Sequence, residues 1–246
     1  MRILNDLYEE PRAESLPPAV TAAPSRKSQL LEVLVFLFLI GPSMVLSFFA
    51  LKGGAVSFDL LAGATILRDL ALVCLLAFFL WRNQEPVRRI GWTAQGVFRE
   101  AVLGIVLFIP MLIAANAIET YLRGAGLSGT PKSLSNMLTP SGPWEFALAF
   151  ILVVVVAIAE ETIFRGYLML RIGSLTGSSA AAVILSAAIF SVGHGYEGVA
   201  GVATVGFMGL VLALVYLWRR SLVAPMVMHF LQDFIAIFAL PLLLHK

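Results

Sequence analysis

The feature that most constrains this chain is a series of long apolar stretches that recurs along its length. Stretches of roughly 18 to 25 residues match the helix length needed to cross about 30 Å of hydrocarbon. Hydrophobic residues make up 59% of the sequence and charged residues only 13%, about half the charged fraction of a typical soluble domain. So little polar surface cannot cover a globule in water, and we predict a helical bundle embedded in a membrane.

Reading the apolar stretches against polar breaks predicts seven spans, at about 30–51, 60–81, 101–122, 144–172, 180–196, 200–218 and 222–244. The fourth is long for one crossing, so we expect it to project beyond the bilayer at one end or to break there. The predicted fold class is all-α: a polytopic transmembrane bundle of about seven spans, or eight helices if the fourth breaks.

The positions of lysine and arginine predict the orientation of the bundle. Most of the 17 lysines and arginines precede the first span, follow the second, close the fourth or follow the sixth. Such residues are enriched in cytoplasmic loops, which places the N-terminus inside the cell. We expect residues 1–28, polar and rich in proline, to form a disordered cytoplasmic tail before an integral membrane domain at 29–246. The net charge of +2 is spread over short loops, so we expect no nucleic-acid partner.

A few ionisable residues lie inside the predicted spans, where charge is costly and usually marks function or a paired structural contact. Arg68 and Asp69 are adjacent in the second span. Because neighbouring side chains on a helix point about 100° apart, we expect them to pair poorly with each other and to find partners on other helices. We interpret both as structural polar contacts within the bundle.

The fourth span contains Glu160 and Glu161 side by side, with Arg165 further along. Glu161 and Arg165 are four residues apart with the acid first, which is the favourable order for an ion pair on a helix. This pairing leaves Glu160, on a different face, without a cation on its own helix and suited to act as a general base. The alternative is a helix end that emerges among lipid headgroups, where Glu and Arg are ordinary.

Two of the three histidines fall in apolar stretches. His194 stands between Gly193 and Gly195, so nothing bulky shields its imidazole and another backbone can approach closely. His229 and Asp233 are four residues apart and share a helical face. Asp233 can therefore accept a hydrogen bond from the imidazole and fix its tautomer, or both side chains can contact one ligand.

Together these side chains meet the needs of amide hydrolysis in a site short of water. A carboxylate can take a proton from water, a histidine can help to position that water, and further donors can meet the developing oxyanion. The same set could hold zinc through His and Glu with a water in the open position. The sequence has no HExxH, the usual zinc-peptidase motif.

At these residues the sequence resembles the CPBP family of intramembrane peptidases, which comprises CAAX proteases and bacteriocin-processing enzymes and is also called the Abi family. Three motifs on three spans carry the resemblance: EExxxR at Glu160, Glu161 and Arg165, FxxxH at Phe190 and His194, and HxxxN at His229 and Asp233. The matched core covers 144–244, which would place the catalytic core in the C-terminal four spans. Asp233 departs from the commoner Asn.

The resemblance implies a hydrolase, an endopeptidase commonly labelled a metalloprotease, whose site lies within the membrane. It assigns catalysis to Glu160 and His194, which would activate water, and to His229 and Asp233, which would stabilise the oxyanion, with support from Glu161, Arg165 and Phe190. Whether a divalent metal such as zinc takes part stays open; Glu160, His194 and His229 are the candidate ligands. An ionised Asp233 cannot donate as Asn does, so it must be protonated, orient His229 or bind metal.

Convergence of the three motifs sets a condition on helix length. Counted at 1.5 Å per residue, His229 lies near the cytoplasmic end of its span and His194 near the outer end of its own. The site can therefore form only if the fourth helix continues past Arg165 toward Ile172 and the fifth begins beyond the bilayer.

We therefore predict an intramembrane endopeptidase that cleaves a membrane-associated peptide or protein, in a bacterial cytoplasmic membrane. Its expected partners are the lipid bilayer and that substrate. One alternative is a proton-coupled transporter, which also places Glu, His and Asp in membrane helices, although the sequence shows no internal repeat of the kind on which transporters are built. A second is a non-catalytic immunity or scaffold protein of the same fold, for which Asp233 leaves room.

Overall fold

The structure is a computed structural model that describes residues 24–49, 57–129, 131 and 139–239. Over these residues it is helical and has no strand. The rods are α1 (Arg26–Ser47), α2 (Phe58–Arg82), α3 (Val97–Gly124), α5 (Pro143–Glu160) continued by η3 (Glu161–Leu168) and α6 (Met169–Thr176), α7 (Ser179–Val192), α8 (Gly198–Arg219), and α9 (Val223–Phe234) with η5 (Ile235–Ala239). Two short turns of 3-10 helix, η2 (Val87–Ile90) and η4 (Gly195–Glu197), lie between rods.

This architecture confirms the prediction of an all-α polytopic membrane bundle. Five rods are long and apolar enough to cross a membrane by length and composition, and Ser179–Val192 and Val223–Phe238 are shorter apolar helices. The fourth rod runs unbroken from Pro143 to Thr176, so it meets the condition that it continue past Arg165. It does not break into separate spans; instead its middle turns are π-helical.

Some predicted boundaries move. Helix α1 begins at Arg26, with the Ser25 side chain accepting from the Ser28 backbone N–H, so the end of the expected tail is helical. Residues 1–23 lie outside the described part of the chain, as do the expected span ends at 51 and 240–244. Helix α7 ends at Val192, four residues before the predicted end. Hydropathy does not mark that end, because only one of the next four residues, His194, is strongly polar.

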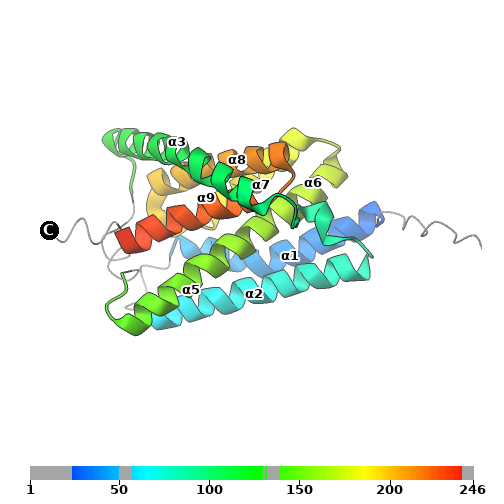
Figure 1. The fold of residues 1–246 in the computed structure, drawn as a ribbon, viewed down its shortest axis with the longest axis horizontal. Helices are drawn as coiled ribbons and strands as arrows, with labels where there is room; N and C mark the ends of the chain where they lie inside the picture. The colour runs from blue at the N-terminus through cyan, green and yellow to red at the C-terminus, as the bar shows by residue number, and fades with distance from the viewer. Residues whose placement is uncertain (1–23, 50–56, 130, 132–138, 240–246) are drawn as a thin grey trace, which may run out of the picture.

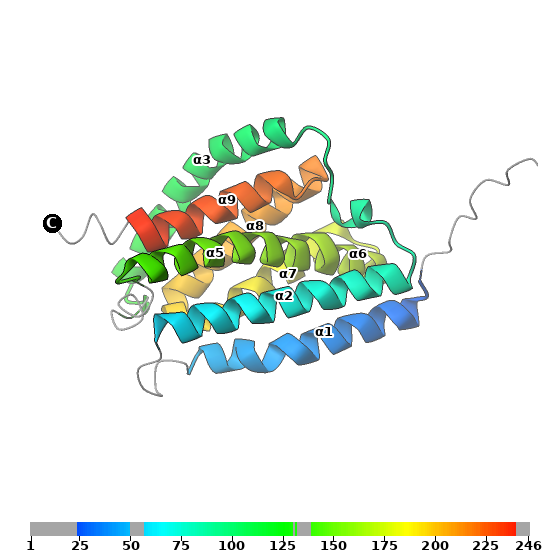
Figure 2. The same ribbon diagram turned by 60° about the horizontal axis from the view of Figure 1, so that its bottom comes forward.

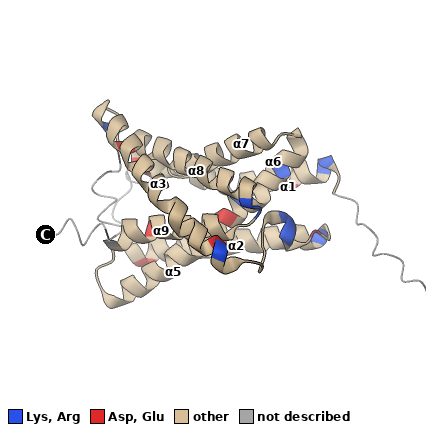
Figure 3. Cartoon of the chain, turned by 45° about the horizontal axis from the view of Figure 1, so that its top comes forward, with Lys and Arg blue, Asp and Glu red and all other residues tan. Residues whose placement is uncertain are grey.

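The rods pass back and forth, so that α1 begins and α9 ends at opposite ends of the bundle (Figure 1). Lysine and arginine gather toward the end at which α1 begins (Figure 3). We call this the basic end; it includes Arg82, Arg89 and Arg219. The sharp turn between α6 and α7 lies here as well, where Gly177 takes a φ of +71° that side chains disfavour.

The rod formed by α5, η3 and α6 is the centre of the molecule. Helix α5 packs between α2 and α9, as Figure 2 shows, while η3 contacts α7 and α8, and α6 contacts α1 and α7. Tyr167 and Leu168, in the middle of this rod, are fully enclosed. Any side chain that η3 points inward is therefore met by neighbours from several other helices.

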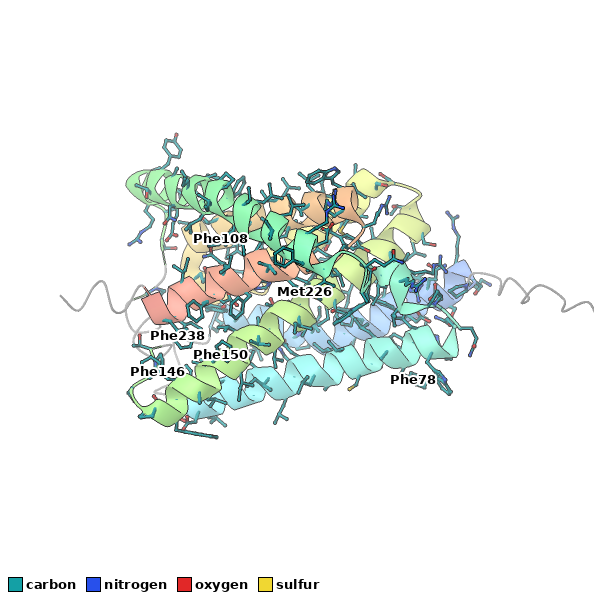
Figure 4. The ribbon with its side chains drawn as sticks, in the orientation of Figure 1. Phe78, Phe108, Phe146, Phe150, Met226 and Phe238 are labelled. Carbon is teal, nitrogen blue, oxygen red and sulfur yellow. The ribbon has the colours of Figure 1, made fainter. Side chains whose placement is uncertain are left out.

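Phenylalanines join α5 to α9 beside this centre. Phe146 and Phe150 project from α5 toward the end of the α9 rod, where Phe238 lies (Figure 4). The Phe146 and Phe238 rings are 5.9 Å apart, and Phe150 meets Phe230 edge to face at 6.2 Å. Such pairs prefer these offset geometries. They hold α9, which carries His229, against the helix that carries Glu160.

A buried ionic cluster ties the first two helices to the central rod at the basic end. Glu32 of α1 is only 2% exposed. Its carboxylate accepts from four donors: Arg82, Asn83 Nδ2 at 2.7 Å, Tyr167 Oη at 2.6 Å and Arg171 Nε at 3.1 Å. Arg171 also pairs with the buried carboxylate of Glu85. We call these six residues the Glu32 cluster; full hydrogen bonding is what allows such charges to be buried.

Candidate active site

The central rod changes its winding where the predicted acidic motif begins. Glu160 is the last residue of α5, and Glu161 opens the π-helical segment η3. All eight residues of η3 are buried. Short π-helical segments inside α-helices are uncommon and occur often at functional sites. Here the segment carries Glu161 and Arg165 into the middle of the bundle.

Glu161 is fully buried and its Oε1 atom accepts from two side chains. Arg165 Nη1 donates over 2.7 Å, which is the i, i+4 pair expected from the spacing. His229 Nδ1 lies 2.9 Å from the same oxygen. A carboxylate paired with arginine only accepts, so we assign the hydrogen of the imidazole to Nδ1. Glu161 therefore fixes the tautomer of His229, which was one of the alternative roles that the sequence left open for Asp233.

Arg165 is also fully buried and is enclosed by α7 and α8. Its Nη2 donates to the Gly209 carbonyl over 3.3 Å, and its guanidinium lies over the Phe190 ring at 4.2 Å from the centroid. A cation stacked on an aromatic face is favourable, especially away from water. Phe190, the first residue of the second motif, thus supports the arginine of the first motif.

Glu160 forms no ion pair within its own rod, and its contacts come from α2 and α9. Its Oε2 atom is buried and has no hydrogen-bond partner among the described residues. That oxygen lies 3.9 Å from His229 Nε2, and Oε1 lies 3.8 Å from Arg68 Nη2. Glu161 also has an oxygen, Oε2, without a hydrogen-bond partner, but its Oε1 is held by Arg165 and His229. Glu160 has no such close contact, and its Oε2 faces the open nitrogen of His229 across a gap.

His229 presents its second nitrogen to two carboxylates. Nε2 lies 3.5 Å from Asp233 Oδ2 and 3.9 Å from Glu160 Oε2. With hydrogen on Nδ1, Nε2 of a neutral imidazole is an acceptor, and so are both ionised carboxylates. Three acceptors facing one another in apolar surroundings are unfavourable unless a proton lies among them. We infer that these three side chains together hold at least one proton.

His194 lies just beyond the end of α7, in the turn before η4. Its Nδ1 is 3.0 Å from the Phe190 carbonyl oxygen, which can only accept, so Nδ1 donates and Nε2 carries the lone pair. The Phe190 ring lies 4.8 Å from the His194 ring and 5.9 Å from that of His229. Within the described part of the chain, no hydrogen bond or ion pair joins His194 to Glu160.

The close approach beside His194 is made largely by side chains of the α1 segment, where another backbone had been expected. An added side chain at Gly195 would meet the Phe48 ring from the end of α1, and one at Gly193 would meet Met44. The two glycines therefore let α1 cover the turn that carries the histidine. Glycine spacing indicated a close approach but could not indicate which element makes it.

Arg68 and Asp69 correct the prediction made for them. Arg68 Nε and Nη2 lie 2.9 Å and 2.8 Å from Asp69 Oδ1, so the neighbours do pair with each other. The arginine side chain is long enough to bend around the helix, which an argument from side-chain direction alone leaves out. Arg68 also reaches Glu160, on α5, and so extends from α2 into the site.

The candidate metal ligands do not converge. His229 Nδ1 contacts Glu161 and His194 Nδ1 contacts a backbone carbonyl, so each histidine would offer Nε2 as its ligand atom. No group of three or more His, Cys, Asp or Glu side chains within the described ranges is arranged to hold a metal ion. The residues present do not fit a metal in this arrangement, and the steps below involve the side chains alone.

The bundle and its centre define a polytopic membrane protein with a glutamate, arginine and histidine site enclosed by helices. Residues 142–235 match the family model described as type II CAAX prenyl endopeptidase Rce1-like. This match confirms the resemblance to the CAAX-protease family, a family of proteases, over the segment that carries all three motifs. Helices α1 to α3, and with them Arg68 and Asp69, lie outside the matched segment. No curated protein and no solved structure matched the chain.

Proposed function

We propose that this protein is an intramembrane endopeptidase in which Glu160 activates the attacking water. The observation that carries the proposal is the free, buried Oε2 of Glu160 facing His229 Nε2 at 3.9 Å. One water oxygen at hydrogen-bond distance can contact both atoms across that gap. Glu161, Arg165 and Phe190 hold the histidine and the rod in place around it.

The proposed reaction uses these groups in turn. Glu160 takes a proton from water, with the free Nε2 of His194 as a second acceptor, and the oxygen attacks the carbonyl carbon of the scissile peptide. His229, protonated at Nε2, donates to the oxyanion that forms. A proton then passes from the site to the amide nitrogen, the C–N bond breaks, and a carboxylate and an amine leave. Asp233 offsets the charge of protonated His229.

A prenylated CAAX peptide is the substrate class that the family description suggests. The test uses purified protein in liposomes and an internally quenched peptide with a farnesylated cysteine three residues from its end. We expect the wild type to release the C-terminal tripeptide, identified by mass spectrometry, and Glu160→Gln to be slower by about 100-fold or more. The same peptide without the farnesyl group shows whether the lipid is required.

Equal cleavage by Glu160→Gln and the wild type would refute the role of Glu160. If neither protein cuts either peptide, comparison of membrane proteomes from cells with the wild type and with Glu160→Gln identifies other substrates as peptides that accumulate uncut. No accumulation there would refute the protease assignment.

For location, we propose a bacterial cytoplasmic membrane with the N-terminus inside. The basic end supports this orientation, because arginine and lysine favour the cytoplasmic side. The test introduces single cysteines at Gln95 and at Ser141, on opposite ends of the bundle, into a Cys74→Ser background. In intact cells a membrane-impermeant maleimide should label position 141 and spare position 95. The reverse pattern would invert the topology.

A further inference from the structure

Arg68 is an unusual residue for its position. It lies near the middle of α2, and its side chain is 45% exposed although the surrounding helix surface is apolar. A guanidinium near the middle of a membrane span has a high free-energy cost, which pairing with carboxylates reduces. Its partners are the carboxylates of Asp69 and Glu160, one from its own helix and one from the centre of the site.

Asp69 fixes the direction of this guanidinium. It is 1% exposed, and its Oδ1 accepts a hydrogen bond from Arg68 Nε and lies 2.8 Å from Nη2. Two contacts from the planar fork of an arginine hold it in one orientation, as one contact from a lysine would not. A structural ion pair would be complete at this stage. However, the same Nη2 also lies 3.8 Å from Oε1 of Glu160, on another helix.

Glu160 is thereby flanked on both sides. Oε1 faces Arg68 of α2, and Oε2 faces His229 of α9. We infer that Arg68 is a positioning residue for Glu160: held by Asp69, it fixes the carboxylate so that Oε2 is presented toward His229. This inference rests on the proposed function of Glu160 and adds a residue that lies outside the segment matched by the family model.

The first measurement is the cleavage assay with the farnesylated peptide in liposomes. Arg68→Ala should lower kcat about 10- to 100-fold and leave KM within about 2-fold, because the carboxylate is misplaced while the substrate site is intact. The kcat of Arg68→Lys should lie between those of Arg68→Ala and the wild type, because lysine keeps the positive charge but lacks the planar guanidinium group. The matched control is Arg123→Ala, which removes an arginine from an exposed pair with Glu119 at the other end of the bundle; its rate should not change.

Chemical rescue separates positioning from a general structural role. The Arg68 side chain is not enclosed by the other helices, so the space left by Arg68→Ala can take up a small guanidinium that reaches this surface of α2 through the membrane phase. Added methylguanidinium, at concentrations that leave the wild type unaffected, should raise the kcat of Arg68→Ala by about 5-fold or more. It should have no effect on Arg123→Ala or on Glu160→Gln.

A second readout does not depend on cleavage. A carboxyl group left unpaired in apolar surroundings favours its neutral form, which is the form that reacts with dicyclohexylcarbodiimide. Labelling of Glu160, mapped by peptide mass spectrometry, should rise several-fold in Arg68→Ala and return toward the wild-type level with methylguanidinium. Glu161, which keeps Arg165, should not change and serves as the internal standard.

The outcomes separate the two proposals. Unchanged kcat together with unchanged Glu160 labelling in a folded Arg68→Ala protein would overturn the role of Arg68. A loss of kcat without rescue and without a change in labelling would overturn it too, because a structural defect explains that pattern. If the wild type cleaves nothing but the labelling rises and is reversed, the placement of Glu160 by Arg68 stands and the protease assignment fails.

Discussion

At the scale of single residues, Glu160 and Glu161 are neighbours with opposite effects on the fold. Glu161 neutralises the buried Arg165, so Glu161→Gln leaves a buried cation without its partner and should lower the free energy of unfolding by about 3–5 kcal/mol. Glu160→Gln removes a carboxylate that lies 3.8 Å from Arg68, which keeps Asp69 as its partner, so it should leave stability unchanged or raise it while cleavage is lost. Unfolding by sodium dodecyl sulfate in mixed micelles measures both.

Two further measurements complete this comparison. Arg165→Met in the Glu161→Gln background removes the unpaired cation and should recover part of the lost stability. Equal destabilisation by Glu160→Gln and Glu161→Gln would show that both carboxylates are structural and would contradict the division of roles.

Asp233 gives the second prediction at this scale. Its Oδ2 lies 3.5 Å from His229 Nε2, while the tautomer of that histidine is already fixed by Glu161. Asp233→Asn keeps the shape and adds an N–H donor where an oxyanion can form, so kcat should stay within about 3-fold of the wild type. The kcat of Asp233→Ala should be lower than that of the wild type by about 10-fold or more. Loss of cleavage in Asp233→Asn would mean that the reaction requires the carboxylate itself, as the counter-charge of His229 or as a group that transfers a proton.

The sequence was informative about the site where spacing along one helix decides the contact. The Glu161–Arg165 pair follows from i, i+4 spacing, and so does the neighbourhood of His229 and Asp233. Contacts between helices could not be predicted in this way. The second partner of Glu161 and the reach of Arg68 to Glu160 depend on how distant helices pack, which no local pattern encodes. The catalytic roles of these residues stay predictions.

At the scale of elements, η3 is held by a close approach that only glycine permits. An added Cβ at Gly166 would lie 2.8 Å from the Ile90 carbonyl oxygen, which belongs to backbone and cannot turn aside. Gly166→Ala should therefore shift η3 and destabilise the protein by about 1–3 kcal/mol, with a loss of cleavage because Arg165 is the adjacent residue. Detergent unfolding and the peptide assay measure the two effects.

Gly63, in α2, is the matched control. No atom lies within 4 Å of a Cβ built there, so Gly63→Ala should be neutral or stabilise the helix by about 0.5–1 kcal/mol. If Gly166→Ala is equally well tolerated, the contact between η2 and η3 does not constrain the rod.

The elements themselves were largely predictable, because long apolar stretches leave few alternatives in a membrane. The exceptions have physical causes. The change to π-helical winding at Glu161, one turn before the buried Arg165, leaves no mark on hydropathy or on the spacing of apolar residues. The end of α7 at Val192 depends on the glycines and on the cover provided by Phe48, which hydropathy does not register.

At the scale of the whole molecule, the Glu32 cluster joins helices outside the family match to the rod that carries the site. Glu32→Gln halves the acceptors available to Arg82, Asn83, Tyr167 and Arg171, removes the counter-charge of Arg82 and leaves Arg171 with Glu85 alone. We expect a loss of about 3–5 kcal/mol in the free energy of unfolding. Glu119→Gln, in an exposed pair with Arg123, should cost less than about 1 kcal/mol. Similar small losses in both would show that α1 is only loosely attached.

The Glu32 cluster also bears on how the protein is made. Arg82 follows Glu32 by 50 residues, whereas Arg171 follows it by 139, so during synthesis the first hairpin can enter the bilayer with its acid already neutralised. We expect Arg82→Leu, but not Arg171→Leu, to impair insertion of that hairpin in a glycosylation-reporter assay; equal insertion of both would contradict this order. The inserted hairpin would then form the surface on which the later rod docks, and the candidate site would be complete only after residues 143–176 had packed against it.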